Sequence, residues 1–291
     1  MTQILTSDSR QYRFGYRIHS PSEVPRDFPP LPPPGEWLAA IFIPGDTEAF
    51  WQPPEYPPRI YLLQKNSLAI HSHPASCEAL FEEPLRDLAG VELQKSLLYG
   101  TIEFHTDSAS RCFRYSTVHQ KVLNLFLLTL RRNWLSPREI CLPAIPLPGA
   151  DRASMMRCLH ALQMELDSGE LLYGLCCQPA IQMKSRTWFF PRSRTTPAIL
   201  LAATSKRVIS ISTGAGEIND PYELVIRYAT PSGLAAVEAQ ESTAGFSLNI
   251  SIRSGCIWKF LFSNDQIGAV SSFLAVLERM APIASQNMPA T

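Results

Sequence analysis

The sequence predicts a mostly-β fold of the α+β class, built from two similar halves of antiparallel strands that each end in a helix. The stretch GEWLAAIFIPG from Gly35 nearly returns as GELLYGLCCQP from Gly169. After this stretch, each half alternates apolar and polar residues between turn-forming residues, which is typical of half-buried antiparallel strands. Each half then closes with an apolar stripe at helical spacing. A repeat over this length indicates a duplicated fold.

Composition limits the classes of protein that the chain can be. Its 291 residues suffice for two domains of roughly 100–150 residues. The formal net charge is zero, so no overall field favours nucleic acid, and we expect no nucleic-acid partner. The seven cysteines form no CxxC pair, which suits free thiols in the cytoplasm. We expect no signal peptide, because the first residues lack an apolar core.

Proline is concentrated near the start of the chain. Twelve of the 25 prolines lie within the first 58 residues, including the run PSEVPRDFPPLPPPGEW. Proline lacks a backbone donor and cannot continue a helix or a central strand. We therefore interpret residues 1–34 as an extended arm, either packed on a domain or mobile. Its PPLPPP segment could bind an aromatic-lined groove, but we favour a stiff spacer that leads into the Gly-Glu strand.

The two halves are expected to share one order of elements. Each has a first strand after Gly-Glu, a hairpin around QKNS or TSKR, a strand-like segment, a second hairpin and a helix. The strand-like segments are residues 84–93 and 222–240. Thr117 with Gln120, and Ser263 with Gln266, are spaced as capping boxes at the two helix starts.

These elements divide the chain into five predicted parts. A further helix from Asp151 to about Asp167 is expected between the halves, with Met155, Leu159, Leu162 and Leu166 along one face. The predicted parts are an arm (1–34), a first domain (35–134), a linker with this helix (135–167), a second domain (168–281) and a tail (282–291).

The phrases RIYLLQKNSLAIHS, VELQKSLLYGTIEFHT and YSTVHQKVLNLFLLTLRR, with their counterparts in the second half, carry a family resemblance. Seven short antiparallel strands and a C-terminal helix resemble the pleckstrin-homology-like (PH-like) split barrel, and the chain is similar to tandem PH-like modules of bacterial proteins. The resemblance implies two split barrels that bind protein, peptide or lipid partners, without a cofactor. It implies a binding module rather than an enzyme.

A basic loop in the second half is the predicted anion site. Lys184, Arg186, Arg192 and Arg194 surround Trp188 within IQMKSRTWFFPRSR. In phosphoinositide-binding PH domains, the loop after the first strand carries a lysine followed by a basic-x-basic pair, and the resemblance implies the same role here. Several cations converging on phosphate with an aromatic tip is also sensible chemistry. The alternative is a solvated basic hairpin.

Histidines and cysteines give weaker signals. His71 and His73, with Cys77 nearby, could hold a metal, but the absence of further ligands at suitable spacing favours a surface strand end. His105 and His119 are expected to be hydrogen-bonded edge residues. The vicinal pair Cys176-Cys177 is expected to serve as small hydrophobic residues, one buried and one pointing outward.

Three functions remain as hypotheses. The first is a non-catalytic, cytoplasmic binding protein that engages a protein or peptide partner through the basic loop and exposed strand edges. The second is peripheral attachment to an anionic membrane through residues 184–194. The third is a hydrolase or metal enzyme using the region of His71 and His73, which the lack of GxSxG, HExxH and phosphate-loop motifs disfavours.

Overall fold

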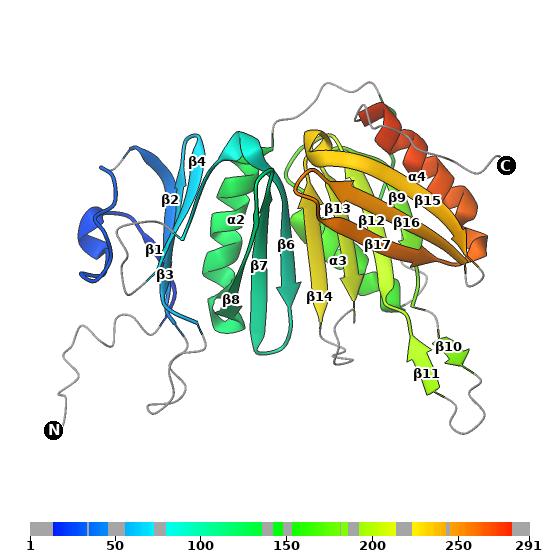
Figure 1. The fold of residues 1–291 in the computed structure, drawn as a ribbon, viewed down its shortest axis with the longest axis horizontal. Helices are drawn as coiled ribbons and strands as arrows, with labels where there is room; N and C mark the ends of the chain where they lie inside the picture. The colour runs from blue at the N-terminus through cyan, green and yellow to red at the C-terminus, as the bar shows by residue number, and fades with distance from the viewer. Residues whose placement is uncertain are drawn as a thin grey trace. The chain divides into compact units, whose positions relative to one another are not determined.

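The computed structural model describes most of the chain. The described residues are 14–33, 35–45, 56–72, 80–135, 142–147, 153–180, 182–185, 192–213, 223–242 and 245–280. They form a mostly-β structure of antiparallel sheets with three α-helices (Figure 1), which confirms the predicted class. Among the described strands, no sheet closes into a barrel.

The chain forms two compact units that do not follow the two halves of the sequence. The first unit is made of residues 1–88, 98–102 and 111–135. The second contains residues 136–291 together with 89–97 and 103–110. Parts of three strands from the first half therefore belong to the second unit. The predicted domain boundaries were drawn along the sequence, and they stay a prediction.

The first unit is built on a five-stranded antiparallel sheet. Its order is β1 (Tyr16–Ile18), β2 (Trp37–Ile43), β3 (Arg59–Gln64), β4 (Ser67–Ser72) and β5 (Phe81–Pro84). The central strand β3 is apolar at consecutive positions, and Ile60 to Leu63 are all buried. Such a continuous run is expected where both faces of a sheet are covered.

The N-terminal arm covers one face of this sheet and a helix covers the other. Ile18, Phe28 and Leu31 of the arm form a buried cluster with β2 and β3 residues, and Phe28 meets Phe42 edge to face at 5.9 Å. Helix α2 (Gln120–Trp134) lies against β2, and Phe126 contacts Tyr61 of β3, with 5.9 Å between ring centroids. Of the two interpretations of the arm, the packed one therefore holds for residues 14–33.

The strand-like segments of both halves divide into two strands. In the first half, the short 3-10 helix η2 (Leu85–Asp87) separates β5 from β6 (Leu88–Lys95), which leads into β7 (Tyr99–Thr106) and β8 (Ser110–Ser116). In the second half, η4 (Pro231–Gly233) separates β14 (Leu224–Ala229) from β15 (Leu234–Ser242). The Thr230 hydroxyl accepts a hydrogen bond from Gly233 N at 2.9 Å and fixes this turn.

The second unit packs two sheets around an apolar core. The strands β9 (Leu172–Gln178), β12 (Ala198–Thr204), β13 (Val208–Thr213) and β14 are consecutive neighbours in one sheet. The other sheet has the order β15, β16 (Gly245–Ile252) and β17 (Ile257–Phe262). Helix α4 (Ile267–Met280) packs on β9 and β12, and its Val270, Phe273 and Leu277 join the core between the sheets.

Helix α3 (Ala153–Glu165) confirms the helix expected between the halves. It lies against β12 and β13 (Figure 1), with Met155, Leu159 and Leu162 buried. Leu166 follows the helix and is half-buried. Every residue of β12 is buried, because the core between the sheets covers one face of the strand and α3 covers the other.

Seven strands and a helix follow one another in the same order in both halves. In the first half these are β2 to β8 and then α2; in the second they are β9, β12 to β17 and then α4. The second half adds a hairpin of β10 (Gln182–Ser185) and β11 (Arg192–Thr195). The first half has no corresponding strands among its described residues.

The two final helices start differently from the predicted capping boxes. A 3-10 turn, η3 (Thr117–His119) or η5 (Asn264–Gln266), precedes each helix. Ser263 is the residue before η5 but forms no side-chain cap; its N–H and hydroxyl donate to Gln178 Oε1 at 2.8 and 3.0 Å. The end of β9 therefore anchors the helix start. None of the described helices is long and apolar enough to cross a membrane.

Candidate functional site

The predicted anion site lies on the β10–β11 hairpin. Lys184 is in β10, and Arg192 and Arg194 are in β11, whereas Arg186 and Trp188 lie outside the described residues. The strands pair antiparallel, with Lys184 opposite Ser193, Met183 opposite Arg194 and Ser185 opposite Arg192. The backbone thus brings the three basic positions into adjacent rungs of one ribbon. Figure 1 shows the hairpin extending beyond the end of β12.

The histidine pair considered as a metal site is only partly described. His71 is in β4 and half-buried, while His73 and Cys77 lie outside the described residues. Burial lowers the pKa of His71, and the opposing attraction of the Glu82 carboxylate is the smaller effect. Within the described ranges, no group of three or more histidine, cysteine, aspartate or glutamate side chains is arranged to hold a metal.

Of the two other histidines, His119 has the predicted hydrogen bond but is buried in η3 rather than at an edge, and the prediction for His105 is wrong. His119 accepts a hydrogen bond from Gly15 N at 3.0 Å through its Nδ1. His105 is not a hydrogen-bonded edge residue: it is 2% exposed, and neither ring nitrogen has a hydrogen-bond partner among the described residues. The nearest carboxylate, Glu103 Oε1, lies 3.8 Å from its Nδ1. Burial lowers the pKa of His105, more strongly than the nearby carboxylates raise it.

The vicinal cysteines behave as the sequence suggests. Cys176 is buried in the core of the second unit, and Cys177, on the next position of β9, is half-buried. Burial raises the pKa of Cys176 to about 12 and that of Cys177 to about 11. Both thiols therefore stay protonated at neutral pH and are poor nucleophiles.

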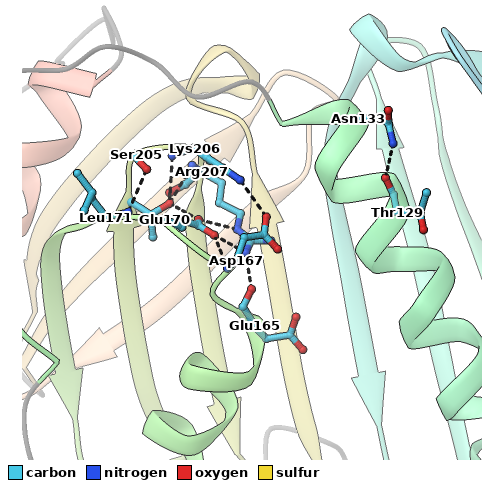
Figure 2. Close-up of polar contacts among 10 residues, drawn as sticks. Thr129, Asn133, Glu165, Asp167, Glu170, Leu171, Ser205, Lys206 and Arg207 are labelled. Atoms are coloured by element: carbon cyan, nitrogen blue, oxygen red, sulfur yellow. Dashed lines mark hydrogen bonds and ion pairs between the residues drawn. The ribbon is translucent and has the colours of Figure 1, made fainter.

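A buried ion pair joins the second Gly-Glu stretch to the β12–β13 turn (Figure 2). Arg207 reaches Glu170 with two hydrogen bonds, Nε to Oε1 at 3.0 Å and an amino group to Oε2 at 2.8 Å. Both side chains are fully buried. The Thr204 hydroxyl donates to Glu170 Oε1 at 2.6 Å, and the Arg207 guanidinium lies 5.1 Å from the Tyr228 ring centroid.

A second layer of contacts surrounds this pair. Lys206 Nζ lies 3.1 Å from Asp167 Oδ2, and Leu171 N donates to the Ser205 hydroxyl at 3.1 Å (Figure 2). The equivalent turn of the first half has Ser67 in place of the arginine, and Ser67 donates to Gln64 at 2.6 Å. The buried charges therefore lock one hairpin turn of the second half, and we assign them a structural role.

Two strands of the first and second halves pair within the second unit. Strand β6 pairs antiparallel with β14 over six positions, from Gly90 opposite Ala229 to Lys95 opposite Leu224. At the centre, Arg227 reaches Glu92 with Nε–Oε2 at 2.8 Å and a second contact of 3.2 Å. No local pattern in the sequence predicts this pair, because Glu92 and Arg227 are 135 residues apart and only the pairing of β6 with β14 brings them together.

An open strand edge lies on the three-stranded sheet of the second unit. Strand β15 pairs on one side with β16, and no described strand pairs with its other side. Val237 and Ala239 of β15 are partly buried, and Glu238 between them is exposed. Such an edge offers unpaired backbone groups to another strand.

Comparisons with known proteins do not assign the chain to a family. No protein-family model matches it, and no curated protein is significantly similar to it. Its function therefore has to be argued from these sites and from the order of the elements.

Proposed function

We propose that this protein is a non-catalytic, cytoplasmic binding protein with two PH-like modules that engage a protein or peptide partner. The observation that carries the proposal is the repeated order of seven antiparallel strands and a C-terminal helix. In the second half, four strands are consecutive neighbours within a larger seven-stranded sheet, three form another sheet, and α4 packs across β9 and β12. This arrangement resembles the PH-like split barrel, a fold that usually presents loops and edges to partners.

The available surfaces support a macromolecular partner. The edge of β15 offers a long row of backbone groups, and the β10–β11 hairpin offers basic positions. An extended peptide gains main-chain hydrogen bonds by adding to such an edge, while its side chains give specificity. Contacts of this kind depend little on ionic strength.

The experiment that tests this function is affinity capture from a lysate at two salt concentrations. We expect one protein to be captured stoichiometrically and retained at 0.5 M salt. Purified components should then reproduce the complex in isothermal titration calorimetry. Failure of every captured protein to bind in purified form would contradict the proposal.

Membrane attachment is a second candidate, favoured by the hairpin itself. Lys184, Arg192 and Arg194 occupy adjacent rungs of the β10–β11 ribbon, and the first half has no such strands among its described residues. Basic residues near an anionic surface each contribute about 1 kcal/mol of attraction, which salt screens.

Liposome co-sedimentation separates the two candidates. Attachment to lipid predicts binding that needs acidic lipid, weakens with salt and is lost when Lys184, Arg192 and Arg194 are all changed to glutamine. A matched control removes three exposed charges elsewhere, at Lys121, Arg132 and Lys259. Equal loss in both variants would indicate a non-specific charge effect, and no binding by the unmodified protein would exclude the basic hairpin as a lipid site.

A further inference from the structure

Strand β15, which has an open edge, nearly repeats the sequence of β6, a strand whose edge is already paired. Strand β6 begins Leu-Ala-Gly-Val-Glu-Leu-Gln from Leu88, and β15 begins Leu-Ala-Ala-Val-Glu-Ala-Gln from Leu234. Five of these seven positions are identical. The two strands also hold the same place in the element order of their halves, directly after a 3-10 turn. What binds β6 therefore indicates what can bind β15.

Strand β14 occupies the edge of β6. Arg227 lies opposite Glu92 and forms a two-pronged ion pair with it, in which each side chain is about one-fifth exposed. On the alternate positions, Ile226 lies opposite Leu93 and Tyr228 opposite Val91, and all four of these residues are buried. An apolar-arginine-apolar triplet therefore matches the Val-Glu-Leu of β6.

Strand β15 has a corresponding glutamate between two apolar residues, and no described strand pairs with it on that edge. Glu238 has the position of Glu92 in the copied sequence and is exposed, and Val237 and Ala239 are only partly buried. By contrast, Val91 and Leu93 of β6, which is paired with β14, are only 2% and 1% exposed. Burying apolar surface and pairing the carboxylate would both favour an added strand.

Strand β5, one of the other described strands that end a sheet, lacks these features. Strand β5 ends its sheet and is four residues long, with the sequence Phe-Glu-Glu-Pro. Short length, charge and proline are the devices that keep an edge from pairing. Strand β15 is nine residues long and contains neither proline nor lysine.

We propose that β15 binds an extended segment of a partner protein as an added antiparallel strand, with an arginine of that segment opposite Glu238. This inference rests on the proposed binding function and names the contact surface and the chemistry of the partner. Apolar side chains lie opposite Val237 and Ala239. Because alanine stands at position 239 where β6 has leucine, the partner residue opposite it is large, as an aromatic residue is.

One residue limits the length of the added strand. A Cβ at Gly90 of β6 would lie 2.9 Å from the carbonyl oxygen of Tyr228, so glycine permits the close approach of β14 there. Strand β15 has Ala236 at the corresponding position. A strand in the same register therefore pairs from Val237 toward the C-terminal end of β15 and is hindered at Ala236.

A peptide copied from β14 provides a defined probe. Fluorescein-labelled peptide of residues 222–230, Tyr-Glu-Leu-Val-Ile-Arg-Tyr-Ala-Thr, is titrated with the full-length protein and followed by fluorescence anisotropy. We expect saturable binding that weakens at least tenfold in Glu238→Arg. A peptide whose arginine is replaced by glutamate should bind the Glu238→Arg protein better than the original protein. Ala236→Gly should bind the original peptide more tightly.

The variants also identify the site. Glu238→Gln, a milder change at this exposed position, should weaken binding less than charge reversal, and circular dichroism should be unchanged in both variants. Absence of peptide binding, or equal binding by Glu238→Arg, would overturn the proposal; the latter result would mean that the peptide displaces β14 from β6. A dimer seen by sedimentation and lost in Glu238→Arg would assign the edge to a second copy and would also overturn it.

The test of the β15 site and the test of the proposed binding function can fail independently. A partner captured equally well by the original protein and by Glu238→Arg would leave the binding function intact while removing β15 as its site. Failure to capture any partner, with the peptide still bound at Glu238, would contradict the broader proposal alone.

Discussion

Arg207 and Glu170 form an ion pair whose two side chains are both fully buried. Taking two charges out of water is costly, and the pair tolerates it because the Thr204 hydroxyl and the Asp167 N–H donate further hydrogen bonds to the carboxylate. The repeated Gly-Glu stretch thus has different roles in the two halves. In the second half its glutamate is held by an arginine, and the first half has Ser67 in the corresponding turn.

Removing one member of this pair should destabilise the second unit strongly. Glu170→Gln leaves the Arg207 charge buried without a counter-ion, and we expect a loss of about 3–5 kcal/mol in unfolding free energy. Urea denaturation measures the loss. The control is Arg253→Gln, which breaks the half-exposed pair with Asp107 (3.3 Å) and should cost below about 1 kcal/mol. Similar losses in the two variants would contradict the assigned role of Glu170.

Buried histidines should make the protein sensitive to acid. Burial lowers the pKa of His71, His105 and His119 below the unfolded value of about 6.5. Between the folded and unfolded pKa values the unfolded chain binds more protons, so the stability present above pH 6.5 is lost as pH falls below it. We expect the melting temperature to fall between pH 7 and pH 5.

His105→Phe should reduce this fall. The substitution removes a side chain whose ring nitrogens form no hydrogen bond with the described residues and which lies near Glu92, Glu103 and Arg227, and it keeps an aromatic ring. Melting curves of both proteins across the same pH range provide the test. An unchanged dependence on pH would show that His105 is protonated in the folded protein without cost.

At the scale of elements, the arm and helix α3 have the same structural role, because each packs on one face of a sheet. Each covers the sheet face that the final helix of its half of the sequence leaves free: residues 14–33 lie on β2 and β3, and α3 lies on β12 and β13. In the arm, β1 pairs with β2, and the buried residues Phe28 and Leu31 further along lie between prolines. At the end of the arm, Trp37 Nε1 donates a hydrogen bond to the carbonyl oxygen of Pro32 at 3.1 Å.

The arm should therefore contribute to stability in spite of its proline content. Phe28→Ala removes a side chain that is 7% exposed and packed on Phe42, and we expect a loss of about 3 kcal/mol in unfolding free energy. Phe14→Ala is the matched control, since Phe14 is 66% exposed and its loss should cost little. Equal stability of the two variants in chemical denaturation would mean that the arm does not pack in solution.

At the scale of the whole molecule, local pattern predicted the elements better than their partners. The strand and helix order, α3 and the turns at QKNS and TSKR follow from periodicity and turn residues, which act over a few positions. The break at η4 was missed because residues 222–240 are apolar on both sides of Pro231. The burial of His105 and the pairing of β6 with β14 depend on distant segments, which no local pattern encodes.

Of the two candidate sites, the sequence predicted the basic hairpin but not the edge of β15. Composition was enough to locate the basic hairpin, because its charges are adjacent in sequence. The edge of β15 could not be found in this way, since an edge is defined by which strands are not beside it. The likeness between Leu88–Gln94 and Leu234–Gln240 acquires meaning only after the structure places β14 on one of the two copies.

The β6–β14 pairing has a consequence for synthesis of the chain. Glu92 and Arg227 are 135 residues apart, so at about 5–20 residues per second the ribosome makes the second strand roughly 7–27 s after the first. During that interval β6 is present without the strand that buries Val91 and Leu93. A nascent chain in this state is open to misassembly and to chaperones, and the sheet of the second unit is completed only after β14 has been synthesised.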